Sequence, residues 1–172
     1  MSSTSTGRVS KLHFYVQDAL GGPNATTWEV ATSEISSLTS SNFGQILVLD
    51  DLITATPDPN SKKLGRFQGL VNSSDLQVRA LNMNVNFYFT QGKFNGSTLS
   101  LLGRNPVTET NRELSVVGGT GAFRMARGYA ISSTYSFNTT ENNGVLEFKV
   151  HVSYPDHDHA PGDDVVQMVT NL

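Results

Sequence analysis

The stretch GGTGAFRMARGYAIS, residues 118–132, decides how this sequence is interpreted. It opens with a glycine-rich turn and continues with alternating small and bulky residues, a pattern typical of a β-strand. Counted by twos, Arg127 is in phase with the bulky residues. Burying a guanidinium, which stays charged in proteins, requires a partner or access to water. We therefore expect Arg127 either to line a cavity that a ligand enters or to reach water at a strand end. The bulky residues in phase with it are Phe123, Met125, Tyr129 and Ile131.

A second charged residue raises the same question in the first predicted strand, KLHFYVQDAL at residues 11–20. Asp18 is in phase there with Phe14 and Val16, so a carboxylate shares the apolar face. The same two explanations apply, a cavity wall or a solvated strand end. Periodicity alone favours the strand end for both charged residues.

The rest of the chain consists of short β-prone runs joined by links rich in Gly, Asn and Pro. The run VLEFKVHVSY at 145–154 alternates most clearly, and no segment shows a helical period with caps. This organisation predicts an all-β fold, an antiparallel barrel or sandwich.

Composition limits the classes of function. The 172 residues suggest one domain with a full hydrophobic core, and the net charge of −3 argues against nucleic acid as a partner. There is no cysteine, which excludes disulfides and thiolate metal sites. No apolar run approaches the roughly 18 residues that a membrane-spanning helix needs, so we expect no membrane span.

Three short motifs have residue types that occur in chemical sites. The adjacent Asp50 and Asp51 would act together only if both faced the same space, and a turn with both in solvent is favoured. The run DHDH at 156–159 has metal-ligand residue types but no second ligand cluster, so we expect no metal. GGTG lacks the continuation of a phosphate-binding loop.

Five motifs, in order and spacing, make the chain resemble the plant dirigent proteins: FYVQDAL, FGQILVLDDLIT, GRFQGL, NGSTLSLLGRNPV and RELSVVGGTGAFRMARGYA. The resemblance implies an eight-stranded antiparallel β-barrel related to the allene oxide cyclase barrel. It also implies a homotrimer with a pocket in each barrel. We expect a flexible segment at 1–10, the barrel at 11–155 and a C-terminal tail at 156–172.

The resemblance also implies a function. Dirigent proteins impose stereoselectivity on the coupling of plant phenoxy radicals, made by a separate laccase or peroxidase, to give lignans. The pterocarpan synthases of the family instead remove water from an isoflavanol through a quinone methide and close a ring. Neither reaction uses a cofactor. FYVQD, VLDDL and FRMARG are more similar to the pterocarpan synthase branch. A pure stereochemical guide and a dehydratase or cyclase both stay open, and a binding-only β-barrel is the remaining alternative.

Site residues carry over only where the motifs match. The family's pocket aspartate and arginine match Asp18, as acid/base residue, and Arg127, as donor to a phenolate or leaving hydroxyl oxygen. Asp51 is a second candidate acid. Ala122 stands where lignan-forming relatives carry an aspartate, which counts against simple lignan coupling. The expected apolar pocket walls are Phe14, Val16, Met125, Tyr129 and Ile131.

The first ten residues contain no apolar segment of a signal peptide, so the chain begins either after a removed signal or as a cytosolic protein. With a signal peptide in its precursor, we expect secretion to the apoplast. Glycosylation is then expected at the sequons of Asn24, Asn72, Asn95 and Asn138.

Overall fold

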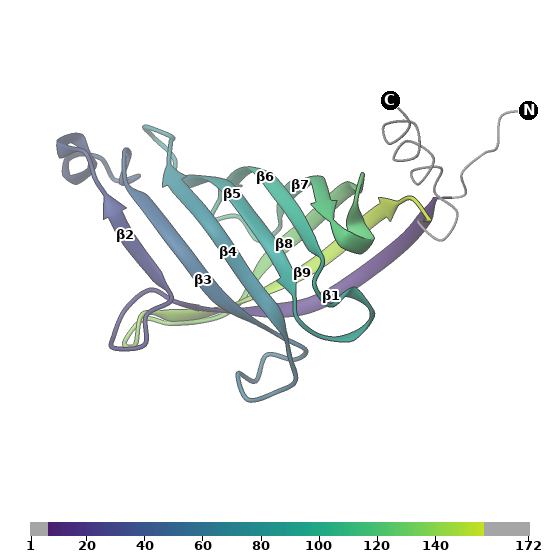
Figure 1. Cartoon of the computed structure of the whole chain (residues 1–172). Helices are drawn as coiled ribbons and strands as arrows, with labels where there is room; N and C mark the ends of the chain where they lie inside the picture. The colour runs from purple at the N-terminus through teal and green to yellow at the C-terminus, as the bar shows by residue number, and fades with distance from the viewer. Residues whose placement is uncertain (1–6, 157–172) are drawn as a thin grey trace, which may run out of the picture.

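The computed structural model describes residues 7–156, which form one continuous antiparallel sheet rolled into a barrel (Figure 1). Its order is β1-β9-β8-β7-β6-β5-β4-β3-β2. The strands are β1 (Arg8–Ala19), β2 (Thr27–Ala31), β3 (Ile46–Thr54), β4 (Lys63–Ser73), β5 (Ala80–Phe89), β6 (Thr98–Pro106), β7 (Arg112–Thr120), β8 (Arg127–Asn138) and β9 (Asn143–Tyr154).

Pairing between β1 and β3 closes the barrel. Because β1 and β2 together fill one strand position beside β3, the nine strands form the expected eight-stranded barrel. The edge of β3 is shared between two partners. Residues 52–54 pair with 15–17 of β1, and the other half of β3 pairs with the short β2. β2 thus continues the edge that β1 leaves at Ala19, and the chain between them makes a loop at 20–26.

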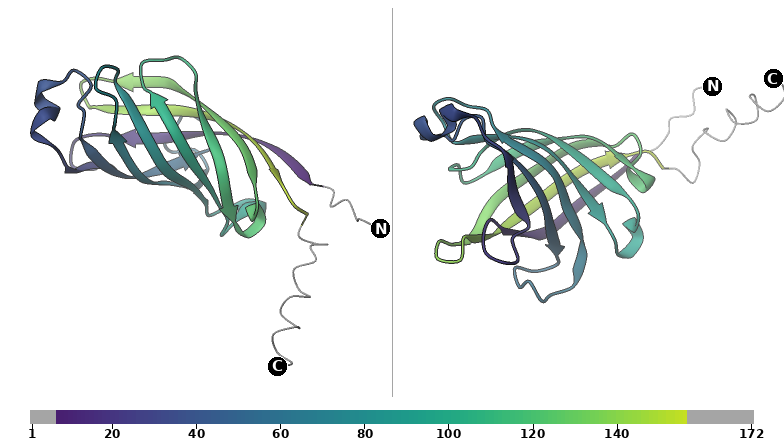
Figure 2. Two further views of the ribbon diagram at one scale, coloured as in Figure 1. Left: turned by 90° about the horizontal axis from the view of Figure 1, so that it is seen from above. Right: turned by 60° about the vertical axis from the view of Figure 1, so that its left-hand side comes forward.

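The barrel has two different ends. β1 begins and β9 finishes at one end, here called the terminal end (Figure 2). The other end, here called the mouth end, carries five connections: 20–26, 32–45, 74–79, 107–111 and 139–142. Because strands that pair with each other run antiparallel, a residue's position along its strand decides at which end of the barrel it lies.

The barrel interior is filled by aromatic rings. Phe87 packs edge-on against Phe14, with ring centroids 4.8 Å apart, and lies 5.1 Å from both Phe67 and Phe148. The inner face of β8 carries small residues beside these rings. In the β8–β9 ladder, Ala130 pairs with Val150 and Ser132 pairs with Phe148. Alternating small and large inward residues fit the limited interior of an eight-stranded barrel.

Two glycines let neighbouring strands approach closely. A Cβ on Gly128 would lie 2.0 Å from the carbonyl oxygen of His151, and one on Gly69 would lie 2.3 Å from that of Asn84. Both positions also have positive φ, 159° and 157°. A side chain therefore does not fit at either position without moving a strand.

The first strand begins earlier than the sequence indicates. β1 starts at Arg8, not at Lys11, because residues 8–10 pair with 152–154 of β9. Ser10 and Tyr154 also share a hydrogen bond of 2.9 Å between their hydroxyl groups. The remainder of the expected end segments, 1–6 and 157–172, lies outside the described residues. Within residues 7–156 the helices are three short 3-10 turns, η1 (Glu34–Leu38), η2 (Gly92–Phe94) and η3 (Gly121–Phe123), none long enough to span a membrane.

Candidate functional site

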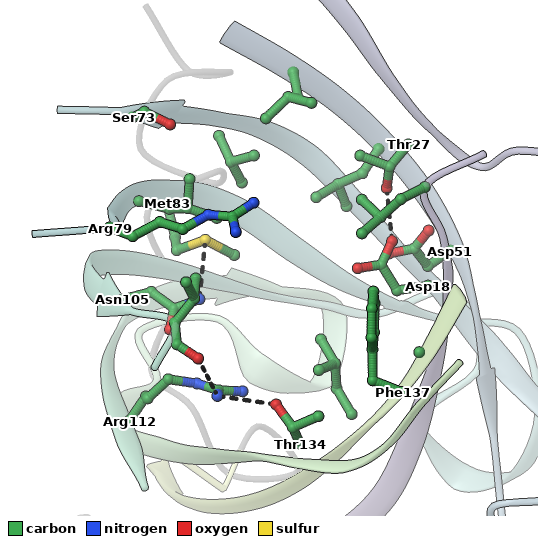
Figure 3. A pocket seen from close by; sticks show the side chains of 18 of the residues that line it. Asp18, Thr27, Asp51, Ser73, Arg79, Met83, Asn105, Arg112, Thr134 and Phe137 are labelled. Atoms are coloured by element: carbon green, nitrogen blue, oxygen red, sulfur yellow. Dashed lines mark hydrogen bonds between the residues drawn. The ribbon is translucent and has the colours of Figure 1, made fainter. Parts of the chain in front are cut away.

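A pocket of about 500 Å³ opens into the barrel at the mouth end. This volume falls in the range of pockets that hold drug-sized ligands, roughly 300–1,000 Å³. Two walls of opposite charge face each other across it (Figure 3). The apolar lining between them comes mainly from β3, β4, β5 and β9: Leu47, Leu49, Phe67, Val71, Leu81, Met83 and Leu146.

The acid wall consists of Asp18 on β1 and Asp51 on β3. The hydroxyl of Thr27 donates to Asp18 Oδ1 at 2.9 Å, and that of Thr26 donates to Asp51 Oδ1 at 2.5 Å. Both threonines lie where β2 begins, so the break between β1 and β2 supplies a donor to each carboxyl. The sequence-predicted Asp18 and Asp51 are thus brought together in one pocket.

Burial raises the pKa of both carboxyls, and repulsion from Asp18 adds to the rise at Asp51. Desolvation is the main cause at Asp18, partly offset by the Thr27 hydrogen bond. Asp51 is 1% exposed, and desolvation together with the nearby charge of Asp18 raises its pKa to about 8. The pair therefore retains a proton at neutral pH and can act as a general acid.

The alternation of β3 separates Asp51 from its neighbour. Asp51 is opposite Phe67 in the middle of the β3–β4 ladder and points into the barrel. Asp50 points outward, where Arg66 Nε donates to its Oδ1 at 2.7 Å and holds its pKa below the usual range. The prediction of a strand-end turn with both carboxylates in solvent is therefore wrong, because the strand continues to Thr54.

The opposite wall contains a buried guanidinium that the sequence analysis missed. Arg112, at the start of β7, is 4% exposed and lines the pocket. Within residues 7–156 it has no carboxylate partner at ion-pair distance, and its Nε has no acceptor. Its other nitrogens donate to the carbonyl oxygens of Val107 and Glu109 and to the hydroxyls of Ser132 and Thr134. Burial lowers the pKa of Arg112, but the group stays charged.

Asn105 on β6 adds a neutral polar group beside Arg112 (Figure 3). Its Nδ2 donates to the sulfur of Met83 at 3.6 Å, and its Oδ1 is buried without a protein donor among the described residues. A buried polar atom without a partner costs roughly 1–3 kcal/mol. The basic wall therefore contains two buried polar atoms, Arg112 Nε and Asn105 Oδ1, that no other described residue satisfies.

Arg127 lies outside this pocket, so the prediction that it lines a pocket wall with Asp18 is wrong. It starts β8 at the terminal end, opposite Ser153, whereas Asp18 is opposite Gly144 at the mouth end. Its side chain is exposed, and its Nη1 donates to the carbonyl oxygens of Val117 and Ala126, both at 2.7 Å. The strand-end explanation therefore holds for Arg127.

The expected apolar walls are wrong as well, for a related reason. Phe123 lies in the turn η3 and Met125 has a φ of 62°, so the alternation does not run unbroken from the turn into β8. Met125 is exposed, and Tyr129 and Ile131 lie on the outer face of β8. Phe14 and Val16 do point inward, but they lie in the closed core and not on the pocket wall.

Within the described part of the chain, no group of three or more His, Asp or Glu side chains is arranged to hold a metal ion. Most of the DHDH run at 156–159 lies outside the described residues. The polar groups that converge on the pocket are acid/base groups and hydrogen-bond donors.

Comparison with known proteins agrees with this geometry. The family model of dirigent-like proteins matches residues 9–153. Dirigent protein 21 of Arabidopsis thaliana is 40% identical over 145 residues, covering 84% of this chain and 77% of that protein. Pterocarpan synthase 1 of Glycyrrhiza echinata is 39% identical over 157 residues, covering 88% and 84%.

Solved structures give the same result. The structure of the pterocarpan synthase dirigent protein GePTS1 superposes with a TM-score of 0.81 at 36% identity, covering 91% of this chain and 98% of that one. Family model, curated relatives and fold all coincide over the closed barrel that carries the pocket. This chain therefore belongs to the dirigent protein family.

Proposed function

We propose that this protein binds a plant phenolic, as a phenoxy radical or quinone methide, and imposes stereoselectivity on its coupling or cyclisation. The observation that carries the proposal is the Asp18–Asp51 pair, two carboxyls that share one apolar pocket of ligand size and whose pKa values burial raises. In lignan-type coupling a separate laccase or peroxidase supplies the radical, and the barrel fixes which face reacts.

The pocket walls fit an oxygenated aromatic ligand. Phe67 and Phe137 offer ring surfaces for packing, and Asp51 offers a proton to an oxygen on one side. On the other side Arg112 and Asn105 add a guanidinium and an amide to the pocket lining. A ligand held between unlike walls presents one face to attack, which is the physical requirement for stereocontrol.

A second mode, an isoflavanol dehydratase and cyclase like the pterocarpan synthases, would use the same acid pair, because a pKa of about 8 lets Asp51 serve as a general acid. Asp51 would give its proton to the leaving hydroxyl as the C–O bond breaks, and the phenolic O–H would lose its proton to water. The quinone methide and one water result. On ring closure the attacking hydroxyl would return a proton to Asp51, and the carbonyl oxygen would regain one from water.

Chiral chromatography tests the proposal. The protein is incubated with a 2′-hydroxyisoflavanol without oxidase, and separately with coniferyl alcohol plus a laccase. We expect either ring closure in the first mixture or an enantiomeric excess in the second. Ring closure without oxidase would exclude the pure guide, and racemic or unchanged material in both mixtures would contradict the proposal.

We further propose that the protein assembles as a homotrimer through the outer face of β2 to β6. A row of apolar side chains crosses these strands in register: Trp28 opposite Val48, Val48 opposite Leu70, and then, across Asn84, Leu102. Trp28 is 59% exposed, and all four side chains are exposed in the isolated chain. An exposed row of mostly apolar side chains, interrupted here only at Asn84, is typical of an interaction surface.

Replacing Leu70 by aspartate is expected to convert the trimer to a monomer, because it places a charge in the middle of this row. Light scattering would show the mass fall to about one third, with an unchanged far-ultraviolet circular dichroism spectrum. Val117→Asp, at an exposed apolar position outside the row, serves as the matched control. A Leu70→Asp variant with the mass of the wild type would place the interface elsewhere.

We also propose secretion to the apoplast with glycosylation, supported by the exposure of three sequon asparagines, Asn24, Asn95 and Asn138. Asn72 is half-buried on β4, and its Oδ1 accepts a hydrogen bond from Asn82. In a plant host we expect peptide mass spectrometry to find glycans at one or more of the three exposed sites. A secreted product whose mass a glycosidase leaves unchanged would argue against glycosylation.

A further inference from the structure

Arg79 adds a second cation to the basic side of the pocket, at its rim. It lines the pocket, is exposed, and extends its guanidinium over the cavity toward the acid wall (Figure 3). Among residues 7–156 no carboxylate lies at ion-pair distance from it. Its backbone carbonyl accepts from Val107 N at 3.1 Å, so the main chain at this position is fixed.

The connection that carries Arg79 keeps its guanidinium without a carboxylate partner. Asp75, four residues earlier, directs its carboxylate elsewhere: Oδ2 accepts from Arg104 at 2.9 Å, and Oδ1 accepts from the backbone N–H groups of Gln77 and Val78. These contacts hold the pKa of Asp75 at about 2. Asp75, the carboxylate nearest to Arg79 in the sequence, thus pairs with Arg104. The guanidinium of Arg79 remains available to a ligand in the pocket.

The pocket therefore has an excess of positive charge inside a protein whose net charge is −3. Arg79 and Arg112 contribute two positive charges, and the acid pair, which retains a proton at neutral pH, contributes at most one negative charge. Arg79 and Arg112 stand across the cavity from Asp18 and Asp51 (Figure 3).

The geometry points to Arg79 as the specificity residue of a carboxylate subsite at the pocket rim, so that the preferred ligand is a phenolic carrying a carboxylate opposite its reacting oxygen. This inference rests on the proposed phenolic function and narrows its substrate class. A guanidinium binds a carboxylate through two parallel N–H···O hydrogen bonds. A neutral alcohol or ester offers neither the negative charge nor this pair of equivalent acceptors. Leu20 and Phe137, which are apolar and line the pocket, give the aromatic ring of such a ligand a surface to pack against.

Equilibrium binding of a matched ligand pair tests the inference. The probes are 4-hydroxy-3-methoxycinnamic acid and its methyl ester, which share the phenol and differ in the charge, measured by calorimetry at pH 7. We expect the acid to bind more tightly than the ester. Arg79→Gln should weaken the acid about three- to tenfold and leave the ester unchanged. Raising the salt concentration should reduce the preference for the acid.

Arg124→Gln is the control, since it removes the same charge from an exposed side chain at the terminal end. It should change neither affinity. If the acid and ester bind equally, or Arg79→Gln weakens both alike, the carboxylate subsite is wrong while phenolic binding stands. If neither probe nor the isoflavanol and coniferyl alcohol of the function test binds, the phenolic function itself fails and the subsite with it.

Discussion

Replacing Asp51 by asparagine is expected to reduce ring closure or stereoselective product formation by about a hundred- to ten-thousandfold, the usual contribution of a general acid. Asparagine keeps the shape of the protonated carboxyl, and its Oδ1 still accepts the hydrogen bond from Thr26. It has no proton of suitable acidity to transfer. Product should therefore be lost while the ligand still binds, and rate and affinity are measured separately to show this.

The same substitution should stabilise the protein above acidic pH. The pKa of Asp51 is about 8 in the folded protein and about 4 in an unfolded chain. A raised pKa favours the folded state fully below pH 4, and this contribution is lost as the pH rises from 4 to 8. Asparagine does not ionise, so Asp51→Asn should match the wild type near pH 4 and exceed its stability on the order of a few kcal/mol at pH 8.

Denaturant unfolding at pH 4, 6 and 8 measures this difference. Asp50→Asn is the matched control, because the adjacent carboxylate lies outside the barrel, has a lowered pKa and should leave product formation nearly unchanged. Activity of Asp51→Asn within about threefold of the wild type would remove Asp51 from the chemistry. A stability difference that is the same at all three pH values would mean that its pKa is not raised.

Replacing Gly128 by alanine is expected to prevent folding or to lower the melting temperature by about 10 °C or more. The added Cβ would lie 2.0 Å from the His151 carbonyl oxygen and 3.0 Å from the Cα of Val152, so the backbone of β9 must move. The β8–β9 ladder belongs to the closed barrel, and the strain therefore spreads through the whole sheet. We estimate the cost at about 4 kcal/mol or more, a large part of the stability of a typical domain.

Gly118→Ala is the control for the backbone, because the nearest atom to its Cβ is the flexible Arg127 Nη1 at 3.9 Å. It should melt within a few degrees of the wild type. Thermal melting followed by circular dichroism compares the two variants. Equal melting temperatures would show that β8 and β9 can separate at this point without loss.

Alternation along the strands was enough to predict the all-β fold and to place Asp18 on the same face as Phe14 and Val16, because β1 is regular from Arg8 to Ala19. The pocket role of Asp18 came from the family resemblance, since alternation alone favoured a solvated strand end. The barrel's closure came from the family resemblance, since pairing of β1 with β3 leaves no local sequence signal. The partnership of Asp18 with Asp51 is likewise long-range, and only the folded sheet brings them together.

Alternation gave the wrong face for Arg127 because it was counted from the turn before β8 into the strand, where the backbone is not continuously extended. The turn at Gly121–Phe123 and the positive φ at Met125 shift the phase, and the inner face of β8 carries the small residues instead of the bulky ones. Applied to RELSVV at 112–117, alternation places Arg112 with Leu114 and Val116 and identifies the guanidinium that does line the pocket. That signal was present in the sequence and was missed.

The start of β1 and the end of β9 lie at the opposite end of the barrel from the pocket. Arg8 and Asp156, joined by an ion pair of 2.8 Å, lie at the terminal end, a full strand length from Asp18 and the pocket. A resin, a surface or a second enzyme can be attached to the protein at Arg8 or at Asp156. The pocket then points away from the attachment. Protein immobilised in this way would keep its mouth end facing the solution, so phenolics could diffuse freely to the pocket.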